Sequence, residues 1–245
     1  RLLLDTGAHR DFYAQTFGLP RDKMAVAYIG CDETLFYPRP AIPPASDGMS
    51  TSTFHVFTYT SFLRLHGVEQ ILHAARQLEG CVDARQRPIS FTIAGDGVHR
   101  ADMQRLAADL GLRSVRFPGW VPYEQLPDQI AGADLCLGGP FSDVPKAARV
   151  ISTKTYQFIA MRKATIVADN PATREVFVPG QHVWAVPMAD ARALAGAVQT
   201  LASDPALRQH LAQGGHGIFQ KRFTTRAIAD QLAPGVQETA CASVL

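Results

Sequence analysis

Three basic residues, Lys146, Arg149 and Lys154, lie close together in the sequence around the predicted start of a helix. Ser152 or Thr153 can cap this helix, because a side-chain oxygen there can accept a hydrogen bond from a free amide of the first turn. The helix start carries partial positive charge, to which the three side chains add formal charge. Any one of these cations alone is most simply a solvated surface charge. Together, at a capped helix that follows a strand, they predict a binding site for an anion such as phosphate.

A second candidate loop, residues 60–67, links a predicted strand to the helix after it. Small Thr60 and Ser61 would let a ligand approach closely, and Gly67 at the helix start would let backbone amides point at an oxyanion. His66 in the same loop is either a ligand-binding residue or an ordinary surface histidine. This loop is weak evidence alone and gains weight only beside the basic stretch.

The familiar nucleotide-binding and hydrolase motifs are incomplete. Gly95-Asp96-Gly97 resembles the beginning of a dinucleotide fingerprint, but Arg100 stands where its third Gly belongs, so this turn is predicted to be structural. The sequence contains neither a P-loop nor a Gly-x-Ser-x-Gly nucleophile motif. Trp120 and Tyr123 flank a bend and could stack on a base, although packing between helix and sheet is the commoner fate of such rings.

Composition narrows the class of protein further. The 245 residues are 47% hydrophobic and 19% charged, and the net charge of +2 provides no broad basic field, so we expect no nucleic-acid partner. The four cysteines are widely spaced and the eight histidines show no ligand spacing, so we expect no metal site and a reducing compartment. We also expect no cofactor and a cytoplasmic location. No run of about 18 apolar residues is present, which predicts no membrane-spanning helix.

Short apolar strands alternate with helical patterns of about ten residues from position 54 onward. Such alternation forces parallel strand pairing with right-handed crossovers. We therefore predict an α/β fold with a doubly wound, Rossmann-like sheet of about six strands. Residues 1–50, which include Pro38, Pro40, Pro43 and Pro44, are expected to be the tail of a preceding domain plus a linker. Residues 51–235 would form the domain itself and 236–245 a terminal tail.

Taken in order, five pieces of the chain resemble the carboxyl-terminal, donor-binding domain of GT-B-fold glycosyltransferases of family four. No single piece is specific, but their order and spacing are. The pieces are Tyr-Ile-Gly-Cys-Asp-Glu-Thr-Leu-Phe-Tyr-Pro at 28–38, Ile-Ala-Gly-Asp-Gly at 93–97, Val-Arg-Phe-Pro-Gly-Trp-Val at 115–121, the segment 126–135, and Asp-Pro-Ala-Leu-Arg at 204–208.

The resemblance implies a binding site for a nucleotide-sugar. The diphosphate would contact Ser61, His66, Gly67, Lys146, Arg149 and Lys154. The ribose and base would contact Gln157, Val121 and Tyr123, and the sugar would contact Phe141. The chain departs from the family pattern at four of these positions. Ser61 and His66 replace the usual Arg and Lys, while Gln157 and Arg149 replace two Glu residues. A subset of the family shares a Lys-x-x-Arg-Val-Ile-x-x-Lys phrase with this chain, at 146–154.

The resemblance also implies an activity: retaining, metal-independent transfer of a sugar from a nucleotide-sugar to an unknown acceptor, in cell-surface polysaccharide or glycan synthesis. A non-catalytic sugar-nucleotide-binding or scaffolding domain and a GT-B-fold epimerase remain as alternatives. The resemblance assigns no catalytic residue on this chain. The other half of the cleft would come from a missing amino-terminal domain, without which we expect weak donor binding and no transfer. The complete protein is expected in the cytoplasm, with peripheral association at the inner face of the membrane.

Overall fold

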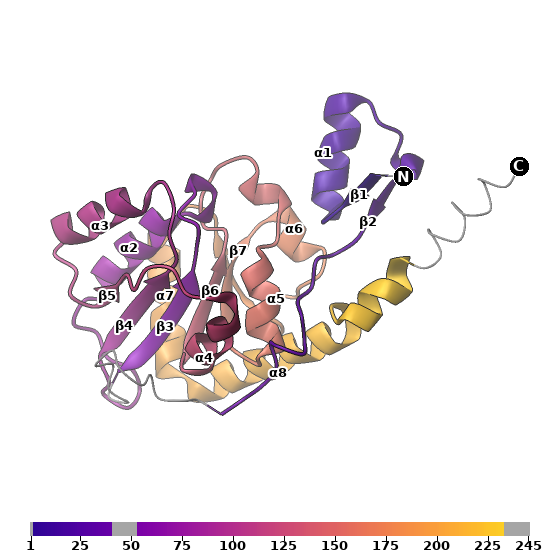
Figure 1. Ribbon diagram of the computed structural model, residues 1–245. Coiled ribbons are helices and arrows are strands. Elements are labelled where there is room, and N and C mark those ends of the chain that lie inside the picture. The colour runs from indigo at the N-terminus through magenta and orange to yellow at the C-terminus, as the bar shows by residue number, and fades with distance from the viewer. Residues whose placement is uncertain (1, 41–52, 233–245) are drawn as a thin grey trace, which may run out of the picture.

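The computed structural model describes residues 2–40 and 53–232, and its main body is a parallel sheet between two layers of helices (Figure 1). The sheet has six strands in the order β5-β4-β3-β6-β7-β8, all parallel. Its strands are β3 (Phe54–Tyr59), β4 (Ile89–Ala94), β5 (Val115–Arg116), β6 (Leu135–Gly139), β7 (Thr165–Asp169) and β8 (Trp184–Pro187). The predicted doubly wound α/β sheet is therefore confirmed.

Helices cover both faces of this sheet because alternate strand side chains point to opposite faces. Phe54 and Val56 of β3 pack into one core, and the next residue, Phe57, points to the opposite face and packs into a second core. Helices α2 (Val68–Gln77), α3 (Arg100–Asp109) and α7 (Ala191–Ser203) cover the first core. Helices α4 (Leu126–Ala131), α5 (Thr153–Ala160) and α8 (Pro205–Arg222) cover the second. Short α6 (Pro171–Arg174) follows β7.

A small unit precedes the main body and is set to one side of it (Figure 1). It consists of β1 (Leu2–Leu4), α1 (Gly7–Phe17) and β2 (Met24–Val26), with β1 and β2 paired in parallel. Thr6 caps α1 by accepting a hydrogen bond from the amide of His9, and Gly18 ends the helix in a left-handed conformation. We refer to these residues, 2–26, as the β1–α1–β2 unit.

Four single-turn 3₁₀ helices complete the elements of the described residues: η1 (Arg21–Lys23), η2 (Arg64–His66), η3 (Tyr123–Gln125) and η4 (Ala147–Arg149). One of them corrects a predicted boundary, because the helix expected over 123–131 begins with η3 and becomes α-helical only at Leu126. The strand expected over 25–29 is also shorter than predicted.

The predicted tail at 236–245 and most of the proline-rich part of the linker lie outside the described residues. Among the helices of the described segments, none is long and apolar enough to cross a bilayer.

Candidate functional site

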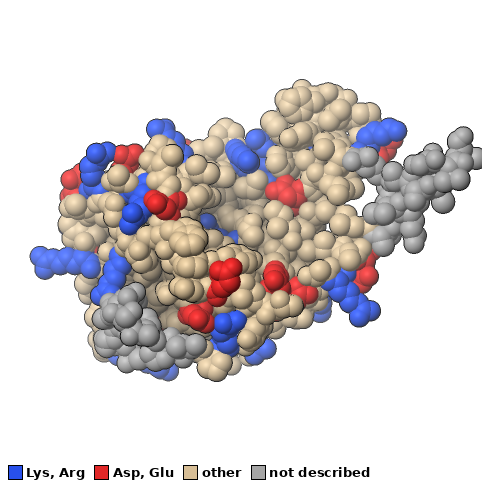
Figure 2. All heavy atoms as spheres, in the orientation of Figure 1, with Lys and Arg blue, Asp and Glu red and all other residues tan. Residues whose placement is uncertain are grey.

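A cavity of about 770 Å³ opens at the carboxyl ends of the strands, where β3 and β6 lie side by side. The chain leaves β3 toward one edge of the sheet and returns through β6 toward the other, so this is the point where the strand order reverses. Ligands of doubly wound sheets bind at such a point, and the volume is typical of small-molecule sites. Figure 2 shows the surface hollowed here, between the main body and the β1–α1–β2 unit.

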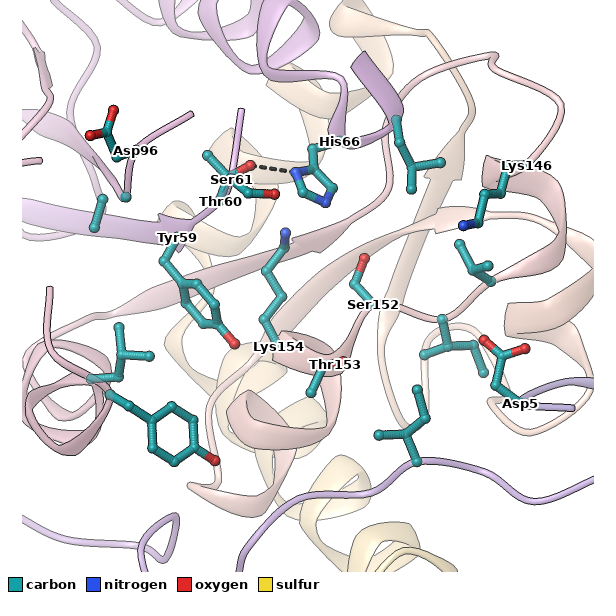
Figure 3. A pocket seen from close by; sticks show the side chains of 18 of the residues that line it. Asp5, Tyr59, Thr60, Ser61, His66, Asp96, Lys146, Ser152, Thr153 and Lys154 are labelled. Atoms are coloured by element: carbon teal, nitrogen blue, oxygen red, sulfur yellow. Dashed lines mark hydrogen bonds between the residues drawn. The ribbon is translucent and has the colours of Figure 1, made fainter. Parts of the chain in front are cut away.

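The loop after β3 contributes Thr60, Ser61 and His66 to the cavity wall. Thr60 Oγ1 lies 2.5 Å from Nδ1 of His66 and accepts a hydrogen bond from the amide of Phe62, so the imidazole is held from one side (Figure 3). Burial and the charge of Lys154 lower the pKa of His66 to about 4. The ring is therefore neutral at pH 7 and can offer a hydrogen bond to a ligand but no charge.

Lys154 in the first turn of α5 supplies a buried positive charge. The residue is only 7% exposed, yet it lines the cavity, and its ammonium points toward Thr60 and His66 (Figure 3). Burial lowers the pKa of Lys154 to about 8, so the side chain is still mostly protonated at pH 7. Within residues 2–40 and 53–232 no hydrogen bond or ion pair joins this ammonium, which lies 5.8 Å from the centre of the Tyr59 ring.

Lys146 and the start of α5 add to the same wall. Lys146 directly precedes η4 and is exposed at the cavity, with its ammonium turned toward the space that Lys154 faces (Figure 3). Ser152 does occupy the N-cap position of α5, but the predicted side-chain cap is wrong, because its hydroxyl makes no capping bond. The first amides of the helix are therefore left for a ligand or solvent.

The loops after β4 and β5 form the far end of the cavity. Gly95 packs so closely on the loop after β3 that a Cβ there would lie 1.9 Å from the carbonyl oxygen of Thr60, and its φ of +115° also requires glycine. This close approach agrees with the structural role predicted for that turn. Asp96, Val121 and Tyr123 line the cavity, together with Trp120, which is 71% exposed.

The fold around this cavity is shared with known proteins, and the sequence model "Glycosyl transferases group 1" matches residues 54–204. The chain belongs to this family. It is 28% identical over 168 residues to the alpha-D-kanosaminyltransferase of Streptomyces kanamyceticus, covering 68% of this chain and 41% of that protein. It is 26% identical over 195 residues to the lipopolysaccharide core biosynthesis glycosyltransferase LpsD of Rhizobium meliloti (strain 1021), covering 78% of this chain and 52% of that protein. The chain thus spans about half the length of these relatives.

Solved structures show the same fold. Anabaena Alr3699/HepE in complex with UDP and glucose superposes with a TM-score of 0.81 at 17% identity, covering 96% of this chain and 62% of that one. The carboxyl-terminal domain of the group 1 glycosyltransferase family protein LpcC from Francisella tularensis gives a TM-score of 0.60 at 15% identity, covering 80% of this chain and all of that one. The group 1 chain therefore has the architecture of a GT-B carboxyl-terminal domain.

Six of the predicted site residues meet at the cavity of this glycosyltransferase-family chain. They are Ser61, His66, Val121, Tyr123, Lys146 and Lys154. They come from loops far apart in the sequence, which only the parallel sheet brings to one edge. The remaining four predicted residues are placed elsewhere, and their role in ligand binding stays a prediction.

Two of those four, Gly67 and Phe141, join the loops behind the cavity wall. The amide of Gly67 itself donates to the carbonyl of Arg64 at 3.1 Å. A Cβ on Gly67 would meet the backbone of Phe141 at 2.5 Å, so glycine lets the two loops touch. Phe141, expected at the sugar, is 2% exposed in the apolar core.

The other two, Arg149 and Gln157, mark departures from the family pattern and do not line the cavity. The guanidinium of Arg149 stacks on Phe12 of α1, with 3.8 Å between its carbon and the ring centre. Gln157 is 2% exposed, and its side-chain oxygen accepts a hydrogen bond from the hydroxyl of Tyr59. It is Tyr59, not Gln157, that lines the cavity.

The cavity also contains residues that sequence reasoning missed. Leu3, Leu4, Asp5 and His9 of the β1–α1–β2 unit form part of its wall. The spacing of Asp5 and His9 at i and i+4 across the start of a helix was the available signal. No group of three or more metal-ligating His, Cys, Asp or Glu side chains occurs in the segments that the structure describes.

Proposed function

We propose that this chain is the nucleotide-sugar-binding half of a glycosyltransferase that transfers a sugar with retention and without a metal ion. The acceptor would be a growing polysaccharide or glycan, a proposal supported by relatives such as the lipopolysaccharide core enzyme LpsD. Complexes of the structural neighbour Anabaena Alr3699/HepE with UDP and with UDP-glucose support this class of donor.

The observation that carries the proposal is the buried ammonium of Lys154. Taking a cation out of water costs free energy, which an anionic partner normally offsets. In the described chain Lys154 has no such partner, although its ammonium faces a cavity large enough for a nucleotide. A diphosphate supplies the missing negative charge.

The neighbours of Lys154 favour a diphosphate over a smaller anion. Lys146 adds a second cation at the rim, the start of α5 has no side-chain cap on its first amides, and neutral His66 can donate a hydrogen bond. Beyond them, Val121, Tyr123 and exposed Trp120 provide surface for a nucleoside, since aromatic rings can stack on a base.

This arrangement also suits the chemistry of transfer. Negative charge develops on the diphosphate as its bond to the sugar breaks, and fixed positive groups stabilise it most when they are shielded from water. Lys154 and Lys146, with the α5 amides, would carry this role in place of a divalent cation. On the complete protein, transfer should persist in EDTA, and NMR of the product should show the anomeric configuration of the donor; an inverted linkage would contradict retention.

Calorimetric titration of the full chain with UDP, GDP and ADP tests the site directly. At least one diphosphate should bind, and Lys154→Met should weaken its binding about tenfold to a hundredfold, as expected for loss of a charge-assisted hydrogen bond worth roughly 1.5–3 kcal/mol. Lys221→Met, at the exposed end of α8, is the matched control. The proposal fails if the folded parent binds none of the three, or if Lys154→Met binds as tightly as the parent.

A further inference from the structure

The cavity has a second polar wall, opposite in character to the cationic one. Asp5 and His9 of the β1–α1–β2 unit line it, beside the apolar side chains of Leu3 and Leu4. Figure 3 shows Asp5 across the cavity from the loop that contains His66, beyond the start of α5. This wall is acidic and apolar, so it does not suit a phosphate.

Asp5 and His9 act as one unit. Nδ1 of His9 lies 2.7 Å from Oδ1 of Asp5, and the two side chains are 19% and 26% exposed, respectively. The rings of His9 and Tyr13 pack in a T-shaped arrangement, with 5.4 Å between ring centres. Within residues 2–40 and 53–232, the second carboxylate oxygen of Asp5 and Nε2 of His9 make no hydrogen bond or ion pair, so both can serve a ligand.

We propose that Asp5 and His9 form a subsite for the hydroxyl groups of a sugar. A carboxylate oxygen accepts hydrogen bonds from hydroxyls, and an imidazole nitrogen can donate or accept one, so the pair suits a neutral, hydroxyl-rich group. The sugar can belong to the donor or to the acceptor, because the cavity lies between the anion-binding wall and the β1–α1–β2 unit. The inference rests on the proposed function and assigns these residues a part in it.

The pair is held in place from behind by the main body. The Thr6 hydroxyl donates to the carbonyl oxygen of Arg149 at 2.5 Å, and the Arg149 guanidinium stacks on Phe12. The carboxylate of Glu175 accepts hydrogen bonds from the first amides of α1, Gly7 at 2.7 Å and Ala8 at 2.5 Å. These contacts fix the start of α1 against the cavity, as a preorganised binding residue requires.

A purely structural role for the pair makes a different prediction. Asp5 and His9 could simply be an i, i+4 pair at a helix start, in which case their removal would change stability and nothing else. The test must therefore measure sugar recognition relative to diphosphate recognition. That ratio is insensitive to a general loss of folded protein.

The experiment compares the full chain with Asp5→Asn and His9→Gln, which keep side chains of similar size. Calorimetry measures the dissociation constants of UDP, GDP and ADP and of UDP-glucose, GDP-mannose and ADP-glucose. Saturation-transfer NMR then measures binding of free glucose, mannose and galactose in the presence of the diphosphate that binds. Asp11→Asn, on the same helix and paired with Arg21, is the control, and thermal melting monitors folding.

A donor sugar in the subsite predicts that both variants weaken the nucleotide-sugar by about threefold to tenfold relative to its diphosphate, which binds as before. An acceptor sugar in the subsite predicts that the ratio of the nucleotide-sugar and diphosphate dissociation constants stays unchanged. It also predicts that saturation transfer to the free monosaccharide is lost. The inference is overturned if both readouts match those of Asp11→Asn, whatever the melting temperature does. If the parent binds no diphosphate at all, the proposed function itself fails and takes the subsite with it.

Discussion

At the scale of single residues, Lys154 is the side chain whose environment says most about function. Burial lowers its pKa from 10.5 to about 8, so the folded chain gives up a proton that the unfolded chain keeps between these values. The contribution of Lys154 to the free energy of unfolding therefore rises with pH between about 8 and 10.5. At pH 7 its buried charge lowers the stability of the folded chain. A bound diphosphate raises the pKa of Lys154 again, because a nearby anion favours the charged form of the side chain.

Diphosphate binding should accordingly take up protons in alkaline solution. At pH 8.5 a lysine with a pKa of about 8 is roughly three-quarters deprotonated, so binding should take up about that fraction of a proton. Calorimetry in two buffers of different ionisation enthalpy measures the uptake. Lys154→Met, titrated at higher protein concentration, should show none; uptake that persists in this variant would assign the proton to another group.

At the scale of elements, the β1–α1–β2 unit depends on the main body for its position. Helix α1 buries no residue fully and carries no acidic side chain in its first turn. Glu175, at the end of α6, supplies that charge from outside and also accepts a hydrogen bond from Tyr28 at 3.2 Å. A cap supplied by another element couples the formation of α1 to the docking of the whole unit.

Removing this external cap should loosen α1 selectively. We expect Glu175→Ala to cost about 1–2 kcal/mol locally, from the loss of a charged cap, and to speed amide exchange throughout α1 while β3 and β6 stay protected. Hydrogen–deuterium exchange with mass spectrometry resolves the two regions. Glu69→Ala, in the first turn of α2, is the control. Unchanged exchange in α1 would show that Thr6 and the Arg149–Phe12 stack hold the unit without Glu175.

At the scale of the whole molecule, the two ends of the sheet have different tasks. The carboxyl ends form the cavity, whereas a charged network closes the amino ends. Arg87 lies 2.8 Å from Asp83 and 3.1 Å from Asp134, and it also donates to the carbonyl of Thr53, which precedes β3. Burial acts to raise the pKa of Asp83, but hydrogen bonds from the Arg87 and Arg85 amides and the Arg87 guanidinium outweigh it, so the pKa is lowered overall.

This network should control stability without touching ligand binding. Because the pKa of Asp83 is lowered in the folded state, its contribution is present above about pH 4 and lost as the pH falls through the folded pKa. Asp83→Asn should cost about 1–3 kcal/mol at pH 7 and flatten the fall in melting temperature from pH 5 to pH 3. Diphosphate affinity should not change. Exposed Asp109→Asn is the control; a parallel loss of affinity in Asp83→Asn would contradict the division of tasks.

The sequence by itself determined the layered architecture and the edge of the sheet that carries the site. The alternation of apolar strands and helices leaves only a parallel, doubly wound arrangement, in which loops far apart in sequence meet at the carboxyl ends of the strands. The same arrangement brings the loop at 60–67 and the basic stretch at 146–154 to one edge of the sheet, whereas the family resemblance is what implies a shared diphosphate site for Ser61, His66, Lys146 and Lys154. The prediction of the sheet works because strand direction and handedness depend on local backbone geometry that short stretches of sequence encode.

Only the tertiary structure decided which way individual side chains face. Lys154 and Gln157 lie one turn apart on α5, yet the first enters the cavity while the second is covered by Tyr59. Arg149 turns to Phe12, and Thr6 reaches the Arg149 carbonyl from 143 positions away. Asp5 and His9 reach the cavity through that same long-range docking. Such orientations depend on packing between segments distant in the chain, which no local pattern in the sequence records.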